Sequence, residues 1–571
     1  MMAWYDEAVF YHIYPLGLAG APAENDYGEP VHRLRALEPW IDHIADTGFT
    51  ALYIGPLFES VGHGYETTDY RKLDSRLGTN EDLKAFVAKC HEKGIRVVFD
   101  GVFNHTGRDF FAFQDLKANR EASRYKDWFC NVNFWGNNEY GDGFSYDNWG
   151  GYNLRVKLNQ RNPEVQNYIC DVIRFWVGEF DIDGIRLDAA DVLDFDFMHV
   201  LRQTADAVKP DLWLMGEVIH GEYSRWVNGG MLHCVTNYHL HKALYSGHND
   251  HNYFEIAHTV KRLYDMGGGR PDGLRLYNFV DNHDVERIAT KLQNKAHYMP
   301  VHILLYTLPG VPSVYYGSEF GIEGRKEWGS DASLRPALCL KDFADAAQTN
   351  ACTRLVRALG RIRKENPVLS YGYYRELQLT NRSYAFVREN GGAAVIVSVN
   401  NDENPCVMEL AVPDVRRADG TPVEAYIGAL SGKRVPVEDG RIRAELDACG
   451  GEIWLPENGP EWEKSAFEPV VESSDFAPQA PAEPVREAGA EKDAAADAAA
   501  AGPAQAGTEP AAEEPAAAPA GTPPEEMTVP QLQAAVLERL AENGPVTDRM
   551  RREVRENVYR DSLLNWVKSF R

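Results

Sequence analysis

Long apolar segments are missing from this chain of 571 residues. No run reaches the roughly 20 apolar residues that a helix needs to cross a bilayer. The start of the chain, residues 1–10, has no basic region followed by an apolar stretch, so it does not resemble a secretory signal. We therefore expect a cytoplasmic protein without a membrane partner.

Cysteine and positive charge are also in short supply. The eight cysteines are scattered and form no C-x-x-C motif, which argues against a disulfide framework or a zinc site and favours reduced thiols. The 59 lysines and arginines are outnumbered by 85 acidic residues, and the formal net charge is -26. This charge argues against nucleic acid and anionic lipid as partners.

The first part of the chain alternates short apolar runs with amphipathic helical patterns. This alternation is typical of a parallel sheet with helical crossovers, and eight such units close a (β/α)8 or TIM barrel of the α/β class. Thr79, Asn80 and Glu81 form a helix start between two of the strands. The expected strands are residues 9–13, 51–54, 96–99, 182–187, 212–215, 276–280 and 313–316, with a less clear one at 234–236.

Two further regions interrupt and follow this barrel. We place the catalytic barrel at residues 1–102 and 160–366, with an inserted subdomain B at residues 103–159 after its third strand. The insertion is rich in Trp, Gly, Asn and Tyr, and a connection of that length is usually functional. Short strands separated by turn signals predict a C-terminal antiparallel β-sandwich at residues 367–456.

The last part of the chain has a different composition. Residues 457–526 are rich in Ala, Pro and Glu and carry roughly half of the net negative charge, which predicts a disordered linker. Residues 527–571 are predicted to form a helical hairpin, broken at Asn543, Gly544 and Pro545. Because so short a hairpin buries little by itself, we expect it to dock on the barrel, on another copy or on a protein partner.

Four motifs place basic and acidic side chains directly after predicted strands. They are Asp-Gly-Val-Phe-Asn-His at residues 100–105, Gly-Ile-Arg-Leu-Asp at 184–188, Gly-Glu at 216–217 and Val-Asp-Asn-His-Asp at 280–284. A single acid at a strand end caps the following helix about as often as it catalyses. Four such motifs in this order indicate the C-terminal face of a barrel, where catalytic groups gather.

This set of side chains suits the cleavage of a glycosidic bond, which requires a proton for the leaving oxygen and a carboxylate facing the oxocarbenium ion. Arg186 lies two residues before Asp188, so both point to one face of the strand, and Arg186 is expected to hold Asp188 ionised as a nucleophile. Glu217 is the candidate general acid, which needs a raised pKa. The remaining candidates are a third acid and two donors to sugar hydroxyls: Asp284, His105 and His283.

The four motifs resemble the signature regions of the α-amylase family, glycoside hydrolase family 13, over about residues 5–455. The resemblance implies a retaining glycosidase of α-glucosidic bonds that requires no cofactor. It implies Asp188 as the nucleophile, Glu217 as the acid/base and Asp284 as the acid that binds and distorts the sugar. Tyr65 is implied to stack under that sugar. Supporting roles are implied for Arg186, His105 and His283.

Two stretches favour the intracellular neopullulanase and cyclomaltodextrinase-like branch of that family. Residues 156–159 and 216–220 are similar to this branch, and residues 189–192 (Ala-Ala-Asp-Val) stand where secreted α-amylases often carry Lys-His. The chain also departs from the branch, which usually begins with an extra β-domain. Ile219 stands where the branch tends to carry an aromatic residue.

Two further sites have alternative interpretations. Asn104 matches a residue that ligates calcium in many family members, so we consider a structural calcium ion there. The alternative is a hydrogen bond that holds the loop bearing His105. Asp331 and Arg335 are expected to bind substrate as an ion pair that closes the sugar pocket, with a surface ion pair as the alternative.

The leading functional hypothesis is the hydrolysis of mainly α-1,4 bonds in short α-glucans, such as maltooligosaccharides or cyclodextrins. A transglycosylase, a glucosyltransferase or an α-glucosidase on the same scaffold is the alternative, because these enzymes differ only in what attacks the intermediate. A non-catalytic carbohydrate-binding or interaction protein is more remote, since the chain keeps all three candidate acids.

Overall fold

The computed structural model describes residues 3–267, 273–327, 330–417, 419–459, 470–476 and 528–542. The chain divides into two units, Met1–Ala482 and Glu483–Arg571, and the first contains every described element except one helix. Within the described ranges, no helix is long and apolar enough to cross a membrane.

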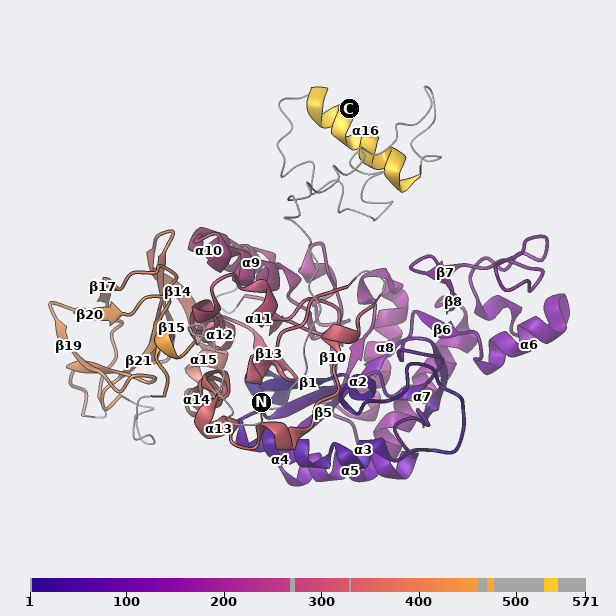
Figure 1. The fold of residues 1–571 in the computed structure, drawn as a ribbon, viewed down its shortest axis with the longest axis horizontal. Helices are drawn as coiled ribbons and strands as arrows, with labels where there is room; N and C mark the ends of the chain where they lie inside the picture. Colours follow the sequence, from indigo (N-terminus) through magenta and orange to yellow (C-terminus); the bar gives the residue numbers. More distant parts are fainter. Residues whose placement is uncertain are drawn as a thin grey trace, which may run out of the picture. The chain divides into compact units, whose positions relative to one another are not determined.

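Eight parallel strands form the centre of the first unit (Figure 1). They are β1 (Phe10–Ile13), β2 (Ala51–Ile54), β5 (Arg96–Gly101), β9 (Gly184–Leu187), β10 (Trp213–Gly216), β11 (Cys234–Val235), β12 (Tyr277–Phe279) and β13 (Val311–Tyr315). Neighbours pair in the order β11-β10-β9-β5-β2-β1-β13-β12. A parallel bridge between Thr236 and Tyr277 joins the two ends, so the sheet closes into the predicted barrel.

Helices cover the outside of the barrel, and the residues of the central strands are almost all buried because both faces of the sheet are covered. Thr79 caps α5 through a capping box with Asp82, at the predicted helix start. The longer helices are α4 (Glu38–Asp46), α5 (Asn80–Glu92), α7 (Pro163–Phe180), α8 (Phe195–Val208), α9 (Tyr238–Asn249), α10 (Tyr253–Met266), α12 (Tyr298–Thr307) and α14 (Ala351–Glu365). Single-turn helices are α1 (Trp4–Glu7), α2 (Pro15–Leu18), α3 (Arg33–Ala36), α11 (Ile288–Lys291), α13 (Ala346–Thr349) and α15 (Val368–Tyr371).

Two small sheets follow the second and third barrel strands. The antiparallel ribbon of β3 (Phe58–Ser60) and β4 (Thr67–Leu73) follows β2, and its connecting loop carries Tyr65. After β5, a three-stranded sheet has the order β6-β8-β7, with β6 at His105–Gly107, β7 at Asn148–Trp149 and β8 at Tyr152–Lys157. Together with α6 (Phe111–Asn119), this sheet occupies the stretch predicted as an inserted subdomain.

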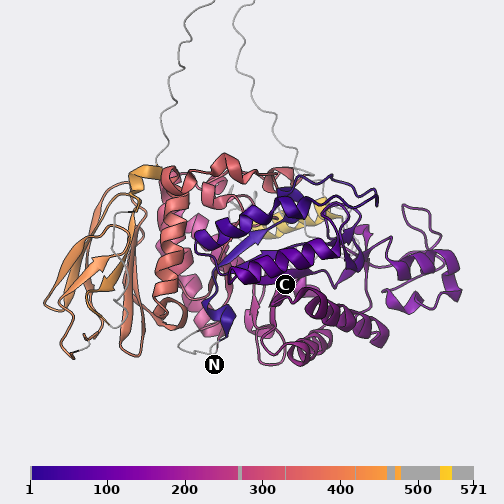
Figure 2. The ribbon, with the colours of Figure 1, turned by 90° about the horizontal axis from the view of Figure 1, so that it is seen from below.

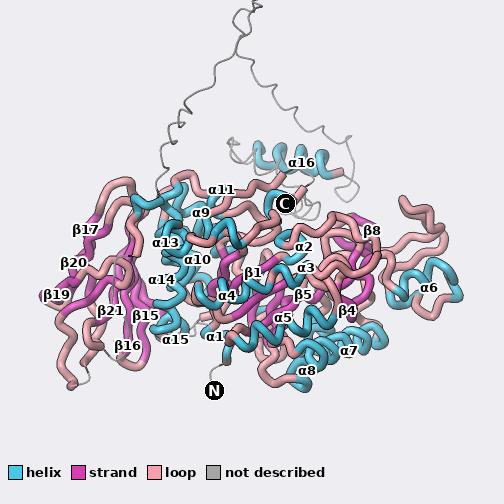
Figure 3. Tube along the Cα trace, turned by 60° about the horizontal axis from the view of Figure 1, so that its bottom comes forward, coloured by secondary structure: helices cyan, strands magenta, loops and turns pink. Residues whose placement is uncertain are grey.

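The second large sheet of the first unit is antiparallel, in the order β14-β15-β16-β21-β18-β19-β20-β17. Its strands are β14 (Tyr373–Leu379), β15 (Ser383–Asn390), β16 (Ala393–Asn400), β17 (Cys406–Ala411), β18 (Ala425–Gly428), β19 (Arg434–Glu438), β20 (Arg441–Leu446) and β21 (Gly451–Pro456). It encloses its own core around Trp454 and Tyr426. Figures 2 and 3 show this sheet and the inserted sheet at opposite ends of the barrel, which confirms the predicted fold class.

A short segment of the predicted linker is ordered. Val470 donates a backbone hydrogen bond to Leu430, and Phe476 stacks on Tyr298 at 5.7 Å between ring centroids. Within the predicted linker, Val470, Val471 and Phe476 are apolar side chains that pack on the folded unit. Most of the linker and the second half of the predicted hairpin lie outside the described residues.

The second unit contributes one described helix, α16 (Val529–Glu542). It begins at the predicted Val529-Pro530 start and ends directly before Asn543. Its Leu532 and Val536 side chains are buried. The domain boundaries given above, and the role of the tail in docking, stay predictions.

Candidate active site

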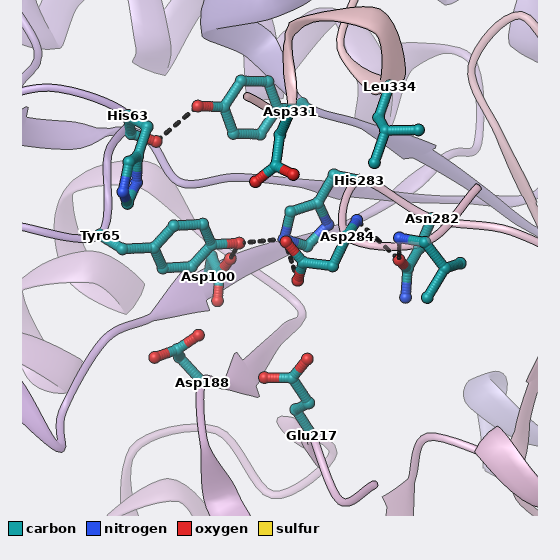
Figure 4. Close-up of polar contacts among 12 residues, drawn as sticks. His63, Tyr65, Asp100, Asp188, Glu217, Asn282, His283, Asp284, Asp331 and Leu334 are labelled. Carbon is teal, nitrogen blue, oxygen red and sulfur yellow. Dashed lines mark hydrogen bonds and ion pairs between the residues drawn. The ribbon is translucent and has the colours of Figure 1, made fainter. Parts of the chain in front are cut away.

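The predicted acids meet at the C-terminal ends of the barrel strands. Asp188 follows β9, Glu217 follows β10 and Asp284 follows β12. Asp100, the penultimate residue of β5, lies at the same ends of the strands. Figure 4 shows the carboxylates of Asp188 and Glu217 pointing into one space, with Asp284 and Tyr65 across from them. The strand-end rule therefore placed all three candidate acids on one face of the barrel.

Arg186 holds this cluster together from within β9. Its Nη1 donates to Asp100 Oδ1 at 2.8 Å and to Asp188 Oδ1 at 2.9 Å, while its Nη2 lies 2.8 Å from Glu217 Oε2. The guanidinium is almost fully buried, and the carboxylates surrounding it raise its pKa well above the ordinary range despite that burial. A planar fork with several donors is the side chain that can bridge three carboxylates at once.

The expected effect of Arg186 on Asp188 is outweighed in this site. Burial raises the pKa of Asp188 well above its ordinary value. The charge of Arg186 is the next largest effect and lowers this pKa, while the charges of Glu217 and Asp100 raise it. The predicted contact of Arg186 with Asp188 is present and lowers the pKa of Asp188, but the role of Asp188 as the nucleophile stays a prediction. Burial and the neighbouring charges therefore act together with Arg186 on the ionisation of Asp188.

Glu217 is fixed by two further contacts. The Tyr238 hydroxyl donates to Oε1 at 3.2 Å, and the backbone N–H of Ala189 donates to Oε2 at 3.2 Å. Ala189 adopts a left-handed conformation with φ of 47°, which is unfavourable for a residue with a Cβ. This backbone strain stands directly beside the nucleophile and turns an N–H toward the acid. Asn282 supports the arrangement by donating to the Tyr238 hydroxyl at 3.2 Å.

Asp284 has the opposite electrostatic character. His283 Nε2 lies 3.1 Å from its Oδ2, and Arg335 Nη2 donates to its Oδ1 at 2.9 Å. Burial works against ionisation, but these two partners outweigh it and hold the pKa of Asp284 well below its ordinary value. Arg335 also contacts Asp331 at 3.2 Å, and its side chain is only 10% exposed. The predicted ion pair is thus part of the site rather than a surface pair.

Tyr65 joins the two halves of the site. Its hydroxyl donates to Asp100 Oδ2 at 3.0 Å and lies 2.5 Å from His283 Nε2. His105 contacts the backbone oxygen of Tyr65 through Nε2 at 3.0 Å. Burial and the nearby charge of Arg155 lower the pKa of His105 to about 3, so His105 is neutral and donates to that oxygen. His105 thereby positions Tyr65, and a hydrogen bond from His105 to a sugar stays a prediction.

Several site residues were not singled out from the sequence. Asp100 opens the first motif and lies at the end of a strand, so it could have been predicted as a site residue on the same grounds as the other acids. Tyr238 follows β11, the strand whose pattern was least clear. Tyr53 donates to Asp100 Oδ2 at 2.9 Å and stacks on His12 at 4.1 Å, but both lie inside strands, where the sequence carries no signal.

The candidate calcium ligand is fully buried and hydrogen-bonded within the protein. The Asn104 side-chain oxygen accepts from Gln160 at 3.1 Å, and its amide nitrogen lies 3.3 Å from His105 Nδ1. In the described part of the chain, no three His, Cys, Asp or Glu side chains are grouped as metal ligands. The side chains present fit the hydrogen-bonding interpretation of Asn104 and do not form a calcium cage.

Known proteins share this fold and these motifs. The model of the α-amylase catalytic domain matches residues 33–361. A cyclomaltodextrinase of Thermoanaerobacter pseudethanolicus is 32% identical over 71% of this chain and 72% of its own length. An intracellular maltogenic amylase of Bacillus subtilis is 30% identical over 65% of this chain and 64% of its own length.

A solved cyclomaltodextrinase structure matches with a TM-score of 0.68 and 26% identity, covering 79% of this chain and 78% of that one. The relatives carry the names of the branch that the sequence motifs favour, and the family model covers more than half of the chain. This chain therefore belongs to the α-amylase family of glycoside hydrolases.

Proposed function

We propose that the protein is a retaining hydrolase of mainly α-1,4-glucosidic bonds in short α-glucans, such as maltooligosaccharides or cyclodextrins. The observation that carries the proposal is the single guanidinium of Arg186 bonded to both Asp188 and Glu217, with Asp284 and Tyr65 opposite. Such a pair of carboxylates facing one space is the arrangement that glycoside hydrolysis needs.

In the first step, the sugar ring lies against Tyr65 and Glu217 donates its proton to the glycosidic oxygen. Asp188 attacks the anomeric carbon as the bond to the leaving sugar breaks, giving a covalent glycosyl-enzyme. Arg186 stabilises both carboxylates while their charges change, and it needs no reorganisation because it is already bonded to each.

In the second step, Glu217 accepts a proton from water, and the water oxygen attacks the anomeric carbon and releases Asp188. Two inversions return the original configuration, which makes the enzyme a retaining one. Asp284, ionised by His283 and Arg335, accepts hydrogen bonds from the hydroxyls of the distorted sugar. Its fixed negative charge also stabilises the positive charge that develops on the ring.

Short α-glucans are the proposed substrates because two relatives bear the names cyclomaltodextrinase and intracellular maltogenic amylase. The Ala189–Val192 segment supports this choice, since it lacks the Lys-His pair of secreted α-amylases. The second name, together with eight unpaired cysteines, also favours the cytoplasm as the proposed location.

The test is product analysis on maltotriose, γ-cyclodextrin, pullulan and soluble starch, with and without a chelator. We expect rapid turnover of the small substrates, slow action on starch and products of retained configuration by NMR. Asp188→Asn should abolish turnover, and near-normal activity in that variant would refute the assignment of the nucleophile. Loss of activity with the chelator would show that the enzyme requires a metal ion such as calcium.

Transglycosylation is the second candidate, because an acceptor sugar can replace water in the second step. A labelled acceptor separates the two reactions: label in longer products indicates a transferase or transglycosylase. Release of single glucose units from the chain end would indicate an α-glucosidase. A protein that binds glucans without turnover would be the non-catalytic alternative.

A further inference from the structure

Three polar side chains beside Tyr65 have no part in the steps above. His63 and Glu66 flank Tyr65 in the β3–β4 loop, and Arg155 lies on β8 of the inserted sheet. His63 Nε2 is 2.8 Å from Glu66 Oε1 and 2.7 Å from Arg155 Nη2. Figure 4 shows His63 next to Tyr65 in the same loop. The cluster therefore borders the position of the sugar.

The hydrogen bonds of this cluster cannot all form at once. If His63 Nε2 carries a proton, it donates to Glu66 but opposes the N–H of Arg155. If it carries none, it accepts from Arg155 but leaves the Glu66 oxygen without a donor. In either state, one of these polar groups lacks a hydrogen-bond partner within the cluster. A hydroxyl group both donates and accepts hydrogen bonds, so a ligand hydroxyl can pair with whichever group of the cluster lacks a partner.

Two more atoms of the cluster are unsatisfied. Glu66 Oε2 and His63 Nδ1 are buried and have no hydrogen-bond partner among the residues that the structure describes. The Glu66 side chain is 3% exposed. Burial opposes its ionisation, but His63 and Arg155 lower the pKa of Glu66, so it is an anionic acceptor. The cluster thus offers both donors and acceptors to a ligand.

The side chains of Arg155 and His63 are partly exposed to solvent. Their side chains are 23% and 39% exposed. Within the described ranges, the Arg155 guanidinium makes one hydrogen bond, to His63, and it lies 3.7 Å from Glu66 Oε1. Its remaining N–H groups provide the paired donors that match neighbouring hydroxyls of a pyranose.

The strand register places Arg155 close to the catalytic residues. In the β6–β8 pair, His105 lies opposite Lys157 and Gly107 lies opposite Arg155. His105 in turn contacts the backbone of Tyr65. Trp149, on the neighbouring β7, stacks on His105 at 6.3 Å between ring centroids. Aromatic rings and polar side chains thus combine on this side of the site, as they do in sugar-binding sites.

We propose that Arg155 and His63, held in place by Glu66, bind hydroxyl groups of the glucan beside Tyr65 and set the preference for substrate length. The inference rests on the proposed function, because it concerns the same substrate. A linear trisaccharide presents free hydroxyls at its ends, whereas a cyclodextrin has no ends. Loss of Arg155 should therefore impair the two substrates unequally.

The test compares Arg155→Ala and Arg155→Lys with wild type on maltotriose and γ-cyclodextrin. Loss of a charged hydrogen-bond donor should raise KM for maltotriose by about 10-fold while kcat changes by less than about 3-fold. Lysine keeps the charge without the planar fork, so Arg155→Lys should recover only part of the loss. Arg174→Ala, which removes an exposed α7 ion pair with Asp171, is the matched control and should match wild type.

A binding measurement separates contact from folding. In the Asp188→Asn background, Arg155→Ala should weaken maltotriose binding by about 10-fold in calorimetry while the circular dichroism spectrum is unchanged. If wild type is active but Arg155→Ala behaves like Arg174→Ala in KM, in substrate ratio and in binding, the inference is overturned and the proposed function stands. If wild type turns over no α-glucoside, the proposed function itself fails.

Discussion

Replacing Arg186 with methionine tests the electrostatic centre of the site. The substitution keeps an unbranched side chain but removes a cation that bonds to three carboxylates. Removing one partner of a buried ion pair costs about 3–5 kcal/mol, which corresponds to a fall of about 10²–10⁴ in kcat if the same energy is lost from the transition state. We expect a loss of that size in both stability to urea and kcat.

The pH profile of this variant distinguishes electrostatics from simple damage. Arg186 lowers the pKa of Asp188, so its removal raises that pKa further. Because Asp188 must be ionised to attack, the acidic limb of kcat/KM should move to higher pH. Arg186→Lys keeps the charge and should keep the position of the acidic limb while losing kcat. An acidic limb that stays in place in Arg186→Met would refute the reasoning.

Four further outcomes follow from the structure. Asp188→Asn should raise stability to urea at neutral pH, because burial raises the pKa of Asp188 and so disfavours its ionised form in the folded protein. The raised pKa means that the native state binds more protons, so this group lowers stability as pH rises. Asp284→Asn should lower stability at neutral pH, because a depressed pKa contributes stability that is lost only as pH falls. Tyr238→Phe should lower kcat by about 10-fold with little change in KM, since the lost hydroxyl contacts Glu217. Truncation after Ala482, the end of the first unit, should leave maltotriose turnover unchanged in a coupled glucose assay, and a loss of activity would make the tail part of the enzyme.

Much of the fold could be predicted because barrel strands have a distinct pattern. Residues 51–54 are a continuous apolar run and form β2. Residues 184–187 are an apolar run interrupted only by Arg186, and they form β9. β11 has only two residues, which is too short for a periodic pattern. In residues 470–476, three apolar side chains contribute little to the composition of a long Ala/Pro/Glu segment, yet they pack on the folded unit, so composition alone does not predict their contacts.

The acids of the site could be predicted for a similar reason. A carboxylate that directly follows a strand of a closed barrel lies on the C-terminal face of the barrel. The supporting contacts could not be predicted, because they depend on which loops meet there. The contact of His105 with the Tyr65 backbone is an example, because the two residues lie 40 positions apart in the chain.

The ionisation of the two aspartates shows most clearly what the sequence leaves open. Asp188 and Asp284 both follow a strand and both have a basic residue one or two positions before them, so their local sequences predict similar charge states. In the structure their pKa values move in opposite directions. Arg186 contacts three carboxylates at once, so Asp188 shares its positive charge with two other acids. Asp284 contacts both His283 and Arg335, and Arg335 lies 51 positions away in the chain. Environments that separate the pKa values of paired acids are how one site performs both proton transfer and charge stabilisation.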